Sequence, residues 1–360
     1  MLRPKLRIEK LMPARHGGID YLEMQKLGIS PAEVLDFSVS TNPYGPPPGL
    51  RQALAEVSID RYPDSDSTEL KSQLAEKLGI SPANLVVGSG STELIRLVTI
   101  AYFGLGAPVL ILQPTYGEYE LSCRIVGAKL IKPPINENEG LQLYPPEIAD
   151  ITQQYHPKGI FLCNPNNPTG QYLTKSGVEQ ILSAARDSLV ILDEAYLAFT
   201  DDTWSPVDLI GGNNLFIVRS MTKDYALAGL RLGYGIAGEH IITTLNKVKP
   251  PWNVSSIAQK AGIYVLNDEQ YLETCRTKIK ESKSFLIEAL EKLGLNPLPS
   301  YTNFFLVKVG DATAFRQALV KKGILVRDCT SFGLPAYIRL ATRPIDECQK
   351  LIAAIKEIGV

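Results

Sequence analysis

Short apolar runs that alternate with amphipathic stretches of helical length constrain the fold of this chain more than any other feature. Runs of strand length occur at residues 85–87, 108–112, 129–131, 159–163, 189–192, 215–218 and 233–237. Amphipathic stretches such as 93–103 and 176–186 lie between most of them. Strands that are apolar along their whole length are typical of a mostly parallel sheet whose two faces are both covered by helices. The sequence therefore predicts a large α/β domain.

The segments that flank this region have different sequence patterns. Residues 1–60 are rich in turns, and a Lys-Pro-Pro break at 249–251 precedes a long helical pattern at 269–293. From 303 onward the pattern reads strand, helix, strand, strand, helix, which suggests a smaller α+β domain. We therefore expect four parts. They are an N-terminal arm at 1–40 that joins the small domain, a large domain at 41–245, linking helices at 246–295 and the small domain at 296–360.

Composition and charge argue against several classes of protein. The 360 residues carry a formal net charge of −1, so no overall field attracts nucleic acid or an anionic membrane. The five cysteines are scattered, and none has a partner at C-x-x-C spacing, which argues against a bound metal. No apolar stretch approaches the roughly 18 residues of a membrane span. No secretory signal is visible, so we expect a cytoplasmic protein without nucleic-acid or membrane partners.

Polar segments follow four of the apolar runs, at 88–93, 164–170, 193–196 and 220–223. In open α/β sheets, ligands bind beyond the carboxyl ends of the strands, so these segments mark a candidate site. Residues 88–92 combine glycines with a helix start, which suits an anion, and Ser91 and Thr92 add hydroxyl donors. Taken alone, that segment is better explained as an ordinary helix cap.

The other three segments offer groups that can carry chemistry. Two X-Pro pairs would hold Asn167 at a strand end with its amide in the site, although a plain turn is the alternative. Asp193 ends a buried run and needs a donor, a cation or a protonated ring, and a structural salt bridge would also satisfy it. Tyr196 adds a phenol. Lys223 follows a strand, where a desolvated lysine becomes nucleophilic, whereas most lysines are solvated.

Together, and in this order, these motifs resemble the class I and II aminotransferases of fold type I, which use pyridoxal 5′-phosphate (PLP). The series is Asn-Pro-x-Asn-Pro-Thr-Gly, Asp-Glu-Ala-Tyr, Ser-x-Thr-Lys and Gly-Leu-Arg-x-Gly, and the match covers essentially the whole chain. The resemblance implies an α/β large domain with a mixed, mostly parallel sheet, a smaller α+β domain and PLP as the cofactor. A transcription regulator of this fold is the other class weighed, but the arm is too short for a DNA-binding domain.

The resemblance also implies roles for individual residues. Lys223 matches the lysine that forms a Schiff base with the cofactor and then carries protons. Asp193 matches the partner of the pyridine nitrogen, and a carboxylate there keeps the ring protonated. Asn167 and Tyr196 match the donors to the phenolate oxygen of the cofactor, and Tyr116 matches the aromatic side chain that stacks on its ring.

Further matches concern phosphate, the substrate and a second subunit. The cradle of the cofactor's phosphate corresponds to Ser91, Thr92, Ser220 and Arg231. Tyr62 matches a tyrosine that reaches the phosphate in the neighbouring subunit, which implies a homodimer. Arg339 matches the arginine that binds the substrate's carboxylate.

Two groups in this family act on phosphorylated amines or amino acids, and both carry an arginine for the substrate phosphate at the position of Arg327. His16 in His-Gly-Gly, Asn42 in the segment 36–43 and Trp252 after proline favour the threonine-phosphate decarboxylases of cobalamin biosynthesis. We count His16 and Asn42 among the substrate contacts.

Other residues favour the second group, the histidinol-phosphate aminotransferases of histidine biosynthesis. They are Tyr116 and the Gly-Ser-Thr-Glu-Leu segment at 90–94. We expect the decarboxylase and keep the aminotransferase as the alternative. The choice depends on which substrate bond is set perpendicular to the cofactor ring, and small positioning contacts decide that.

Overall fold

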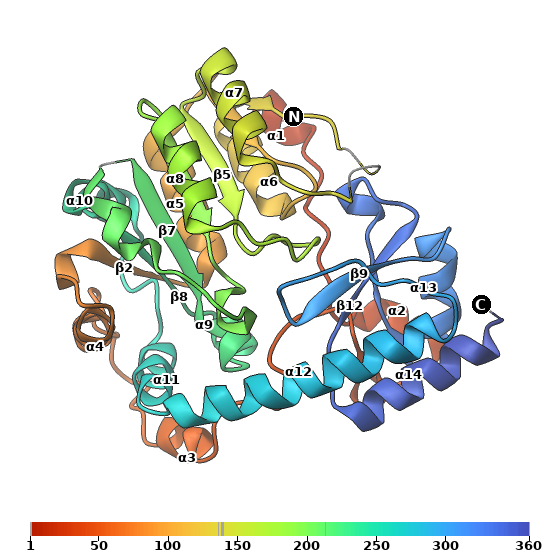
Figure 1. The fold of residues 1–360 in the computed structure, drawn as a ribbon. Coiled ribbons are helices and arrows are strands. Elements are labelled where there is room, and N and C mark those ends of the chain that lie inside the picture. The colour runs from red at the N-terminus through yellow and green to blue at the C-terminus, as the bar shows by residue number, and fades with distance from the viewer. Residues whose placement is uncertain (1, 136, 138–139, 213, 360) are drawn as a thin grey trace.

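A mixed sheet of seven strands forms the centre of the larger body of the molecule (Figure 1). The computed structural model describes residues 2–135, 137, 140–212 and 214–359. In spatial order the strands are β2 (Leu85–Gly88), β8 (Gly233–Ala237), β7 (Leu215–Ser220), β6 (Leu189–Asp193), β5 (Gly159–Cys163), β3 (Pro108–Ile111) and β4 (Lys129–Ile131). Strand β8 is antiparallel to both β2 and β7, and the other described pairs of this sheet are parallel. The predicted α/β fold with a mixed, mostly parallel sheet is confirmed.

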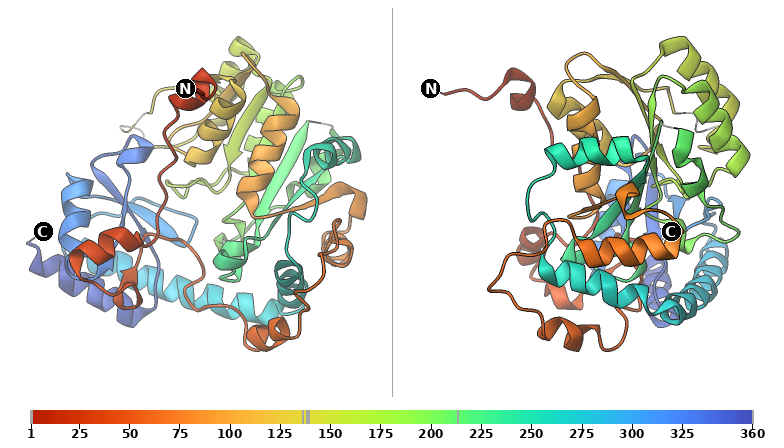
Figure 2. Two further views of the ribbon diagram at one scale, coloured as in Figure 1. Left: turned by 180° about the vertical axis from the view of Figure 1, so that it is seen from behind. Right: turned by 90° about the vertical axis from the view of Figure 1, so that its left-hand side faces the viewer.

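Helices cover both faces of this sheet, which explains why its strands are apolar throughout. Along β5, Ile160 and Leu162 pack into one core cluster, while Phe161 and Cys163 pack into the other, as expected when successive side chains alternate. One face is covered by α4 (Thr68–Leu78), α7 (Pro145–Tyr155), α8 (Lys175–Ala184) and α11 (Ser256–Leu266). The other is covered by α5 (Ser91–Tyr102), α6 (Gly117–Val126) and α10 (Glu239–Val248), as Figure 2 shows from behind.

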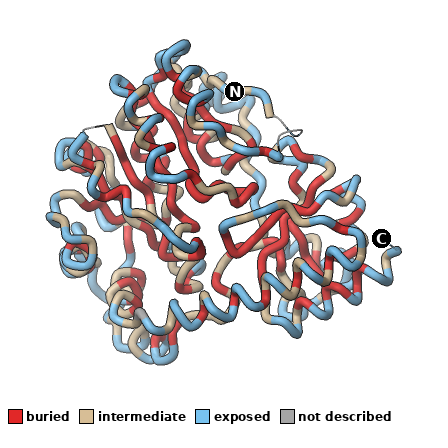
Figure 3. The backbone as a smooth tube through the Cα atoms, viewed as in Figure 1, coloured by how far each residue is buried: buried red, intermediate tan, exposed pale blue. Residues whose placement is uncertain are grey.

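A second, smaller body contains a three-stranded antiparallel sheet in the order β11 (Arg327–Asp328), β12 (Tyr337–Ala341), β9 (Phe304–Lys308). Helices α13 (Ala312–Val320) and α14 (Ile345–Glu357) pack on it around a third core cluster. The long helix α12 (Glu269–Glu291) runs along both bodies (Figure 1). In Figure 3 the buried backbone is concentrated in the strands of the two sheets.

The N-terminal segment contributes to the small body. Strand β1 (Leu35–Asp36) pairs in parallel with β10 (Ile324–Leu325), and Met24 of α2 (Tyr21–Leu27) packs against the same region. Two further short helices, α1 (Leu6–Glu9) and α3 (Leu50–Ala55), lie in the region for which the sequence predicts mainly turns. The domain limits drawn from the sequence remain a prediction.

The described residues include no helix with the length and apolar character needed to cross a membrane. They also include no group of three or more side chains of the metal-ligating types that could hold an ion.

Candidate active site

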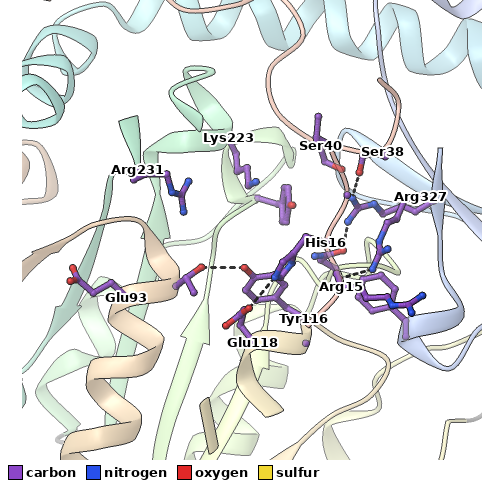
Figure 4. Close-up of a pocket in the computed structure, with 18 of the residues that line it drawn as sticks. Arg15, His16, Ser38, Ser40, Glu93, Tyr116, Glu118, Lys223, Arg231 and Arg327 are labelled. Carbon is purple, nitrogen blue, oxygen red and sulfur yellow. Dashed lines mark hydrogen bonds and ion pairs between the residues drawn. The ribbon is translucent and has the colours of Figure 1, made fainter. Parts of the chain in front are cut away.

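Two connected cavities lie beyond the carboxyl ends of the large sheet's strands, on the side of the small body. The outer one has a volume of about 680 Å³ and the inner one about 70 Å³. Residues of the arm, the large sheet and the small sheet line the outer cavity (Figure 4). Both cavities are lined by Thr92, Tyr116, Asn167, Tyr196, Lys223 and Arg231, all of them predicted site residues.

Strand direction explains why residues from distant parts of the sequence meet here. Strands β5, β6 and β7 are parallel, and β2 has the same direction because β8 is antiparallel to both β2 and β7. Their carboxyl ends therefore share one edge of the sheet, where open α/β sheets bind ligands. Asp193 is the last residue of β6, and β7 leads directly into the short helix α9 (Met221–Asp224), which carries Lys223.

Asp193 is a buried carboxylate, with 3% of its surface exposed. The hydroxyl of Tyr119 donates to its Oδ2 at 2.7 Å, and the backbone amide of Ala195 donates to its Oδ1 at 3.0 Å. Burial raises the pKa of Asp193, while these two donors and the charge of Lys223 oppose that rise. It makes no salt bridge to any described cation, so the site can accept a protonated ring nitrogen as its partner.

Lys223 lies in an environment that favours the neutral amine. Burial lowers its pKa to about 8, and the positive charges of Arg339 and Arg231 act in the same direction. Its Nζ lies 5.9 Å from the centre of the Tyr196 ring. A lysine whose pKa is lowered in this way supplies a nucleophilic amine near neutral pH.

The start of α5 forms a site suited to an anion. No side chain caps this helix, so its first amides stay available, and Gly90 precedes it with a φ of 79°. A Cβ on Gly90 would lie 2.6 Å from Nη2 of Arg231, so glycine is what lets the guanidinium approach the helix end. Arg231 itself has a φ of 55°, an uncommon backbone conformation that clusters at functional sites.

Asn167 and Tyr196 complete the inner cavity. The side-chain oxygen of Asn167 accepts a hydrogen bond from Arg339, and its NH₂ group bonds to no other described residue. Burial raises the pKa of Tyr196 to about 12, so its phenol stays protonated and can donate. Both side chains can therefore supply donors to an oxygen bound between them.

Two buried arginines of the small sheet face the outer cavity. Arg327 of β11 and Arg339 of β12 are direct cross-strand partners, with 8% and 5% of their surfaces exposed. Arg327 donates from Nη2 to the Arg15 carbonyl and the Ser331 hydroxyl, both at 2.7 Å, and Arg339 donates from Nη2 to the Ser38 carbonyl at 2.7 Å.

These two arginines lack a salt-bridge partner in the described chain, although the charge of Asp328 acts on Arg327 from the next position. Neither forms a salt bridge to a described carboxylate, in contrast to Arg219, whose Nε lies 2.8 Å from Glu194. Nε of Arg339 is buried and has no hydrogen-bond partner among the described residues. Burial and the neighbouring Arg339 lower the pKa of Arg327 to about 10. Buried charges are normally paired, so this arrangement indicates one or more anionic ligands.

His16 links the N-terminal arm to α6 beside the outer cavity. Its Nε2 lies 2.9 Å from Oε1 of Glu118, and its ring centre lies 5.6 Å from that of Tyr116 (Figure 4). Arg96 bonds to the other carboxylate oxygen of Glu118 at 3.2 Å. The hydrogen bond from His16 is the largest influence that lowers the pKa of Glu118.

Three predicted site residues do not line either cavity. Ser220 is buried and its hydroxyl lies 2.7 Å from that of Thr222. Asn42 donates from its side chain to the Asp224 carbonyl at 3.0 Å, and thus holds the segment that carries Lys223. Tyr62 is 77% exposed on the surface. The roles assigned to these residues from the sequence remain predictions.

Two residues that the sequence did not identify, Tyr119 and Glu118, contact predicted site residues. Both lie in the first turn of α6, directly after Tyr116, which precedes the helix. Residues three apart on a helix share a face, so the Tyr-x-x-Tyr spacing is a signal that could have identified Tyr119. No comparable signal points to Glu118, because its contact with His16 joins residues 102 positions apart.

The sequence model of the family described as aminotransferase class I and II matches residues 32–355. The chain belongs to this family. It is 34% identical over 345 residues to the histidinol-phosphate aminotransferase of Moorella thermoacetica, covering 93% of this chain and 87% of that protein.

Two solved structures are similar to this chain. The histidinol-phosphate aminotransferase from Sinorhizobium meliloti, in complex with PLP, has a TM-score of 0.88 and 26% identity, covering 99% of this chain and 98% of that one. The L-threonine-O-3-phosphate decarboxylase from Porphyromonas gingivalis has a TM-score of 0.79 and 28% identity, covering 89% and 98%.

The chain is thus a PLP-dependent enzyme of fold type I, as the sequence motifs imply. Its own residues fit that cofactor. The buried carboxylate of Asp193 can pair with a protonated ring nitrogen, the uncapped start of α5 can bind a phosphate, and Lys223 has a lowered pKa.

Proposed function

We propose that this enzyme is a histidinol-phosphate aminotransferase that transfers an amino group from histidinol phosphate to 2-oxoglutarate. The observation that carries the proposal is the pair of buried arginines without a salt-bridge partner among the described residues, Arg327 and Arg339, in the cavity that contains Lys223. Curated relatives of the same name, at 34% identity over 93% of this chain, support the choice of substrate. The arm motifs alone favour the decarboxylase, so the relatives reverse that preference.

We assign the cofactor site as follows. Lys223 would hold PLP covalently and move a proton at the substrate's α-carbon, helped by its lowered pKa. Asp193 would bind the ring nitrogen, and Asn167 and Tyr196 would donate to the ring's oxygen. When bound, PLP supplies an electron sink for the bond that breaks.

The phosphate of the cofactor would bind at the start of α5, between Ser91, Thr92 and Arg231. The guanidinium of Arg231 already lies against Gly90 at that helix end. Ser220, which the sequence predicts as part of this cradle, has its hydroxyl against that of Thr222, so we propose that it also orients the loop before Lys223.

The two arginines would divide the substrates between them. Arg327 would bind the dianionic phosphate of the amino donor, a geometry that a guanidinium fits with two parallel hydrogen bonds. Arg339 would bind the carboxylate of the keto acid. That carboxylate would accept a hydrogen bond from the buried Nε, which has no partner among the described residues. His16, in the arm, lines the outer cavity, where it can contact the distal part of either substrate.

We further propose that the active form is a homodimer. Tyr62 is 77% exposed and does not line the cavities of its own chain, which supports a role in the site of a second copy. A cytoplasmic location also stays a prediction, and the five buried free cysteines are compatible with a reducing compartment.

Threonine-phosphate decarboxylation is the second candidate. The same two arginines could bind a phosphate and a carboxylate of one molecule, and a decarboxylase shares the fold at a TM-score of 0.79. Both reactions need the same cofactor site and differ in how the substrate is turned in it.

The half-reactions separate the two candidates. Histidinol phosphate without a keto acid should bleach the visible absorbance of the bound cofactor in a 1:1 ratio with enzyme, and 2-oxoglutarate should restore it. Threonine phosphate should release no carbon dioxide. Steady carbon dioxide release from threonine phosphate, without bleaching by histidinol phosphate, would overturn the aminotransferase proposal. The Lys223→Ala variant serves as the control and should do neither.

A further inference from the structure

Two aromatic side chains from distant segments form a stack on the surface of the large body. The rings of Tyr62 and Trp252 have centres 4.3 Å apart and planes inclined by 21°. Their exposed fractions are 77% and 47%. The Tyr62 hydroxyl makes no hydrogen bond to any described residue, so the stack fixes the ring and leaves the polar end free.

The Trp252 side of this stack is held rigidly. Trp252 has a φ of 52°, a conformation that a bulky residue adopts only when its surroundings impose it. The next residue, Asn253, donates from its side chain to the Val87 carbonyl at 3.1 Å and to Oε2 of Glu93 at 2.6 Å. Trp252 is thus anchored to β2 and α5 of the large body.

The Tyr62 side is tied to the same part of the molecule. Nζ of Lys249 donates to the Ser65 carbonyl at 2.9 Å, and Nε2 of Gln259 donates to the Asp64 carbonyl at 2.8 Å. These contacts fix the backbone that follows Tyr62. Among the described residues, the tyrosine ring itself stacks on Trp252.

We infer that Trp252 is a positioning residue that holds Tyr62 outward for use in the active site of a second copy of this chain. The inference rests on the homodimer of the proposed function. A tyrosine this exposed would otherwise sample several rotamers and lose that freedom when it docks. Stacking before assembly removes part of that cost, as preorganisation does in other interfaces.

The same loop also touches the chain's own site. Oε2 of Glu93 accepts from the Ser89 amide at 2.6 Å as well as from Asn253, and Glu93 lines the outer cavity. A change at Trp252 could therefore act on its own subunit through Asn253, or on the partner through Tyr62. The inference requires the effect to appear in the partner's site.

Heterodimers with one intact lysine distinguish these routes. In the first, the Lys223→Ala subunit also carries Trp252→Leu. In the second, the subunit that keeps Lys223 carries Trp252→Leu. A heterodimer with Lys223→Ala alone is the reference, and the readout is the PLP dissociation constant of the lysine-containing site, followed by visible absorbance.

The first heterodimer should bind PLP roughly three- to tenfold more weakly than the reference, the size expected for a lost aromatic pair. The second should match the reference. Trp252→Phe, which keeps a stacking ring, should restore affinity in the first arrangement. Equal affinities in all three heterodimers, or a loss confined to the second, would overturn the inference.

The Tyr62→Phe substitution in the same two arrangements tests the underlying dimer separately. A loss only when Tyr62→Phe is in the Lys223→Ala subunit supports the dimer assignment. If Tyr62→Phe gives this result but Trp252→Leu has no matching effect, the dimer assignment stands and the role of Trp252 is rejected. A fully active monomer in sedimentation, with no effect of Tyr62→Phe, would reject the dimer and the inference with it. If Trp252→Leu subunits fail to fold, Trp252→His in the first arrangement decides, because a smaller ring should give an intermediate loss.

Discussion

Tyr119→Phe is the most informative single substitution in the inner cavity, because it removes a hydroxyl that contacts Asp193 and the thiol of Cys163 and keeps the ring. The hydroxyl donates to Oδ2 of Asp193 at 2.7 Å, while the fully buried ring stacks on Phe161 with centres 4.8 Å apart. The stack should persist in the variant. The carboxylate would keep only the backbone amide of Ala195 as a donor.

The sign of the effect follows from the charge state of Asp193. Burial already raises its pKa, and the Tyr119 hydroxyl opposes that rise, so its loss raises the pKa further. PLP binding needs the ionised carboxylate. As the pH falls, the variant should therefore lose binding at a higher pH than the wild type does. A hydrogen bond to a charged group is typically worth about 1.5–3 kcal/mol, so binding on the acid side should weaken roughly ten- to hundredfold.

The assay is PLP affinity of the apoenzyme as a function of pH, followed by visible absorbance. The acid limb should move to higher pH, while affinity on the alkaline side stays near that of the wild type. Tyr155→Phe, at a tyrosine with 51% of its surface exposed, is the matched control and should change nothing. Superimposed profiles for Tyr119→Phe and the wild type would refute the reasoning, and an equal loss at every pH would assign the hydroxyl to packing.

Two further predictions concern cations near the cofactor. Gly90→Ala should weaken PLP binding because its Cβ would displace Arg231, whereas Gly79→Ala, at a left-handed helix end with a φ of 67° and no atom within 4 Å of its Cβ, is the control at a second positive-φ glycine and should leave affinity unchanged. Equal effects of the two substitutions would contradict the role of Arg231. The rate at which apoenzyme captures PLP should rise with pH around a midpoint near 8, the pKa of Lys223, and Arg339→Gln should move that midpoint upward because a nearby positive charge is lost. An unchanged midpoint, measured by stopped-flow absorbance, would contradict this.

Much of the large body could be predicted because its signals are local. Apolar strands covered on both faces leave continuous runs, and β4, β5 and β8 have the limits that the sequence predicts. The meeting of Asp193 and Lys223 also followed from sequence, since both come after parallel strands that end at one edge.

The remaining features depend on how distant segments pair and pack in the folded chain, which no local sequence pattern reveals. The direct pairing of Arg327 with Arg339 arises from the antiparallel register of β11 and β12. In the same way, the hydrogen bond between Tyr119 and Asp193 joins residues 74 positions apart, so no local pattern predicts it. Asn42 shows that a motif residue near the site can hold the backbone beside Lys223 without lining the cavity, and its predicted substrate contact stays a prediction.

Borohydride reduction of the PLP-loaded enzyme, followed by peptide mapping, tests the central assignment most directly. Two lysines make the test sharp, because burial lowers the pKa of both Lys223 and Lys283 to about 8. Lys283 donates to the carbonyls of Ser300 and Thr302, and it lines a different cavity. The assignment predicts that the cofactor is fixed to the peptide containing Lys223. Cofactor attached to Lys283, or to any other lysine, would contradict it.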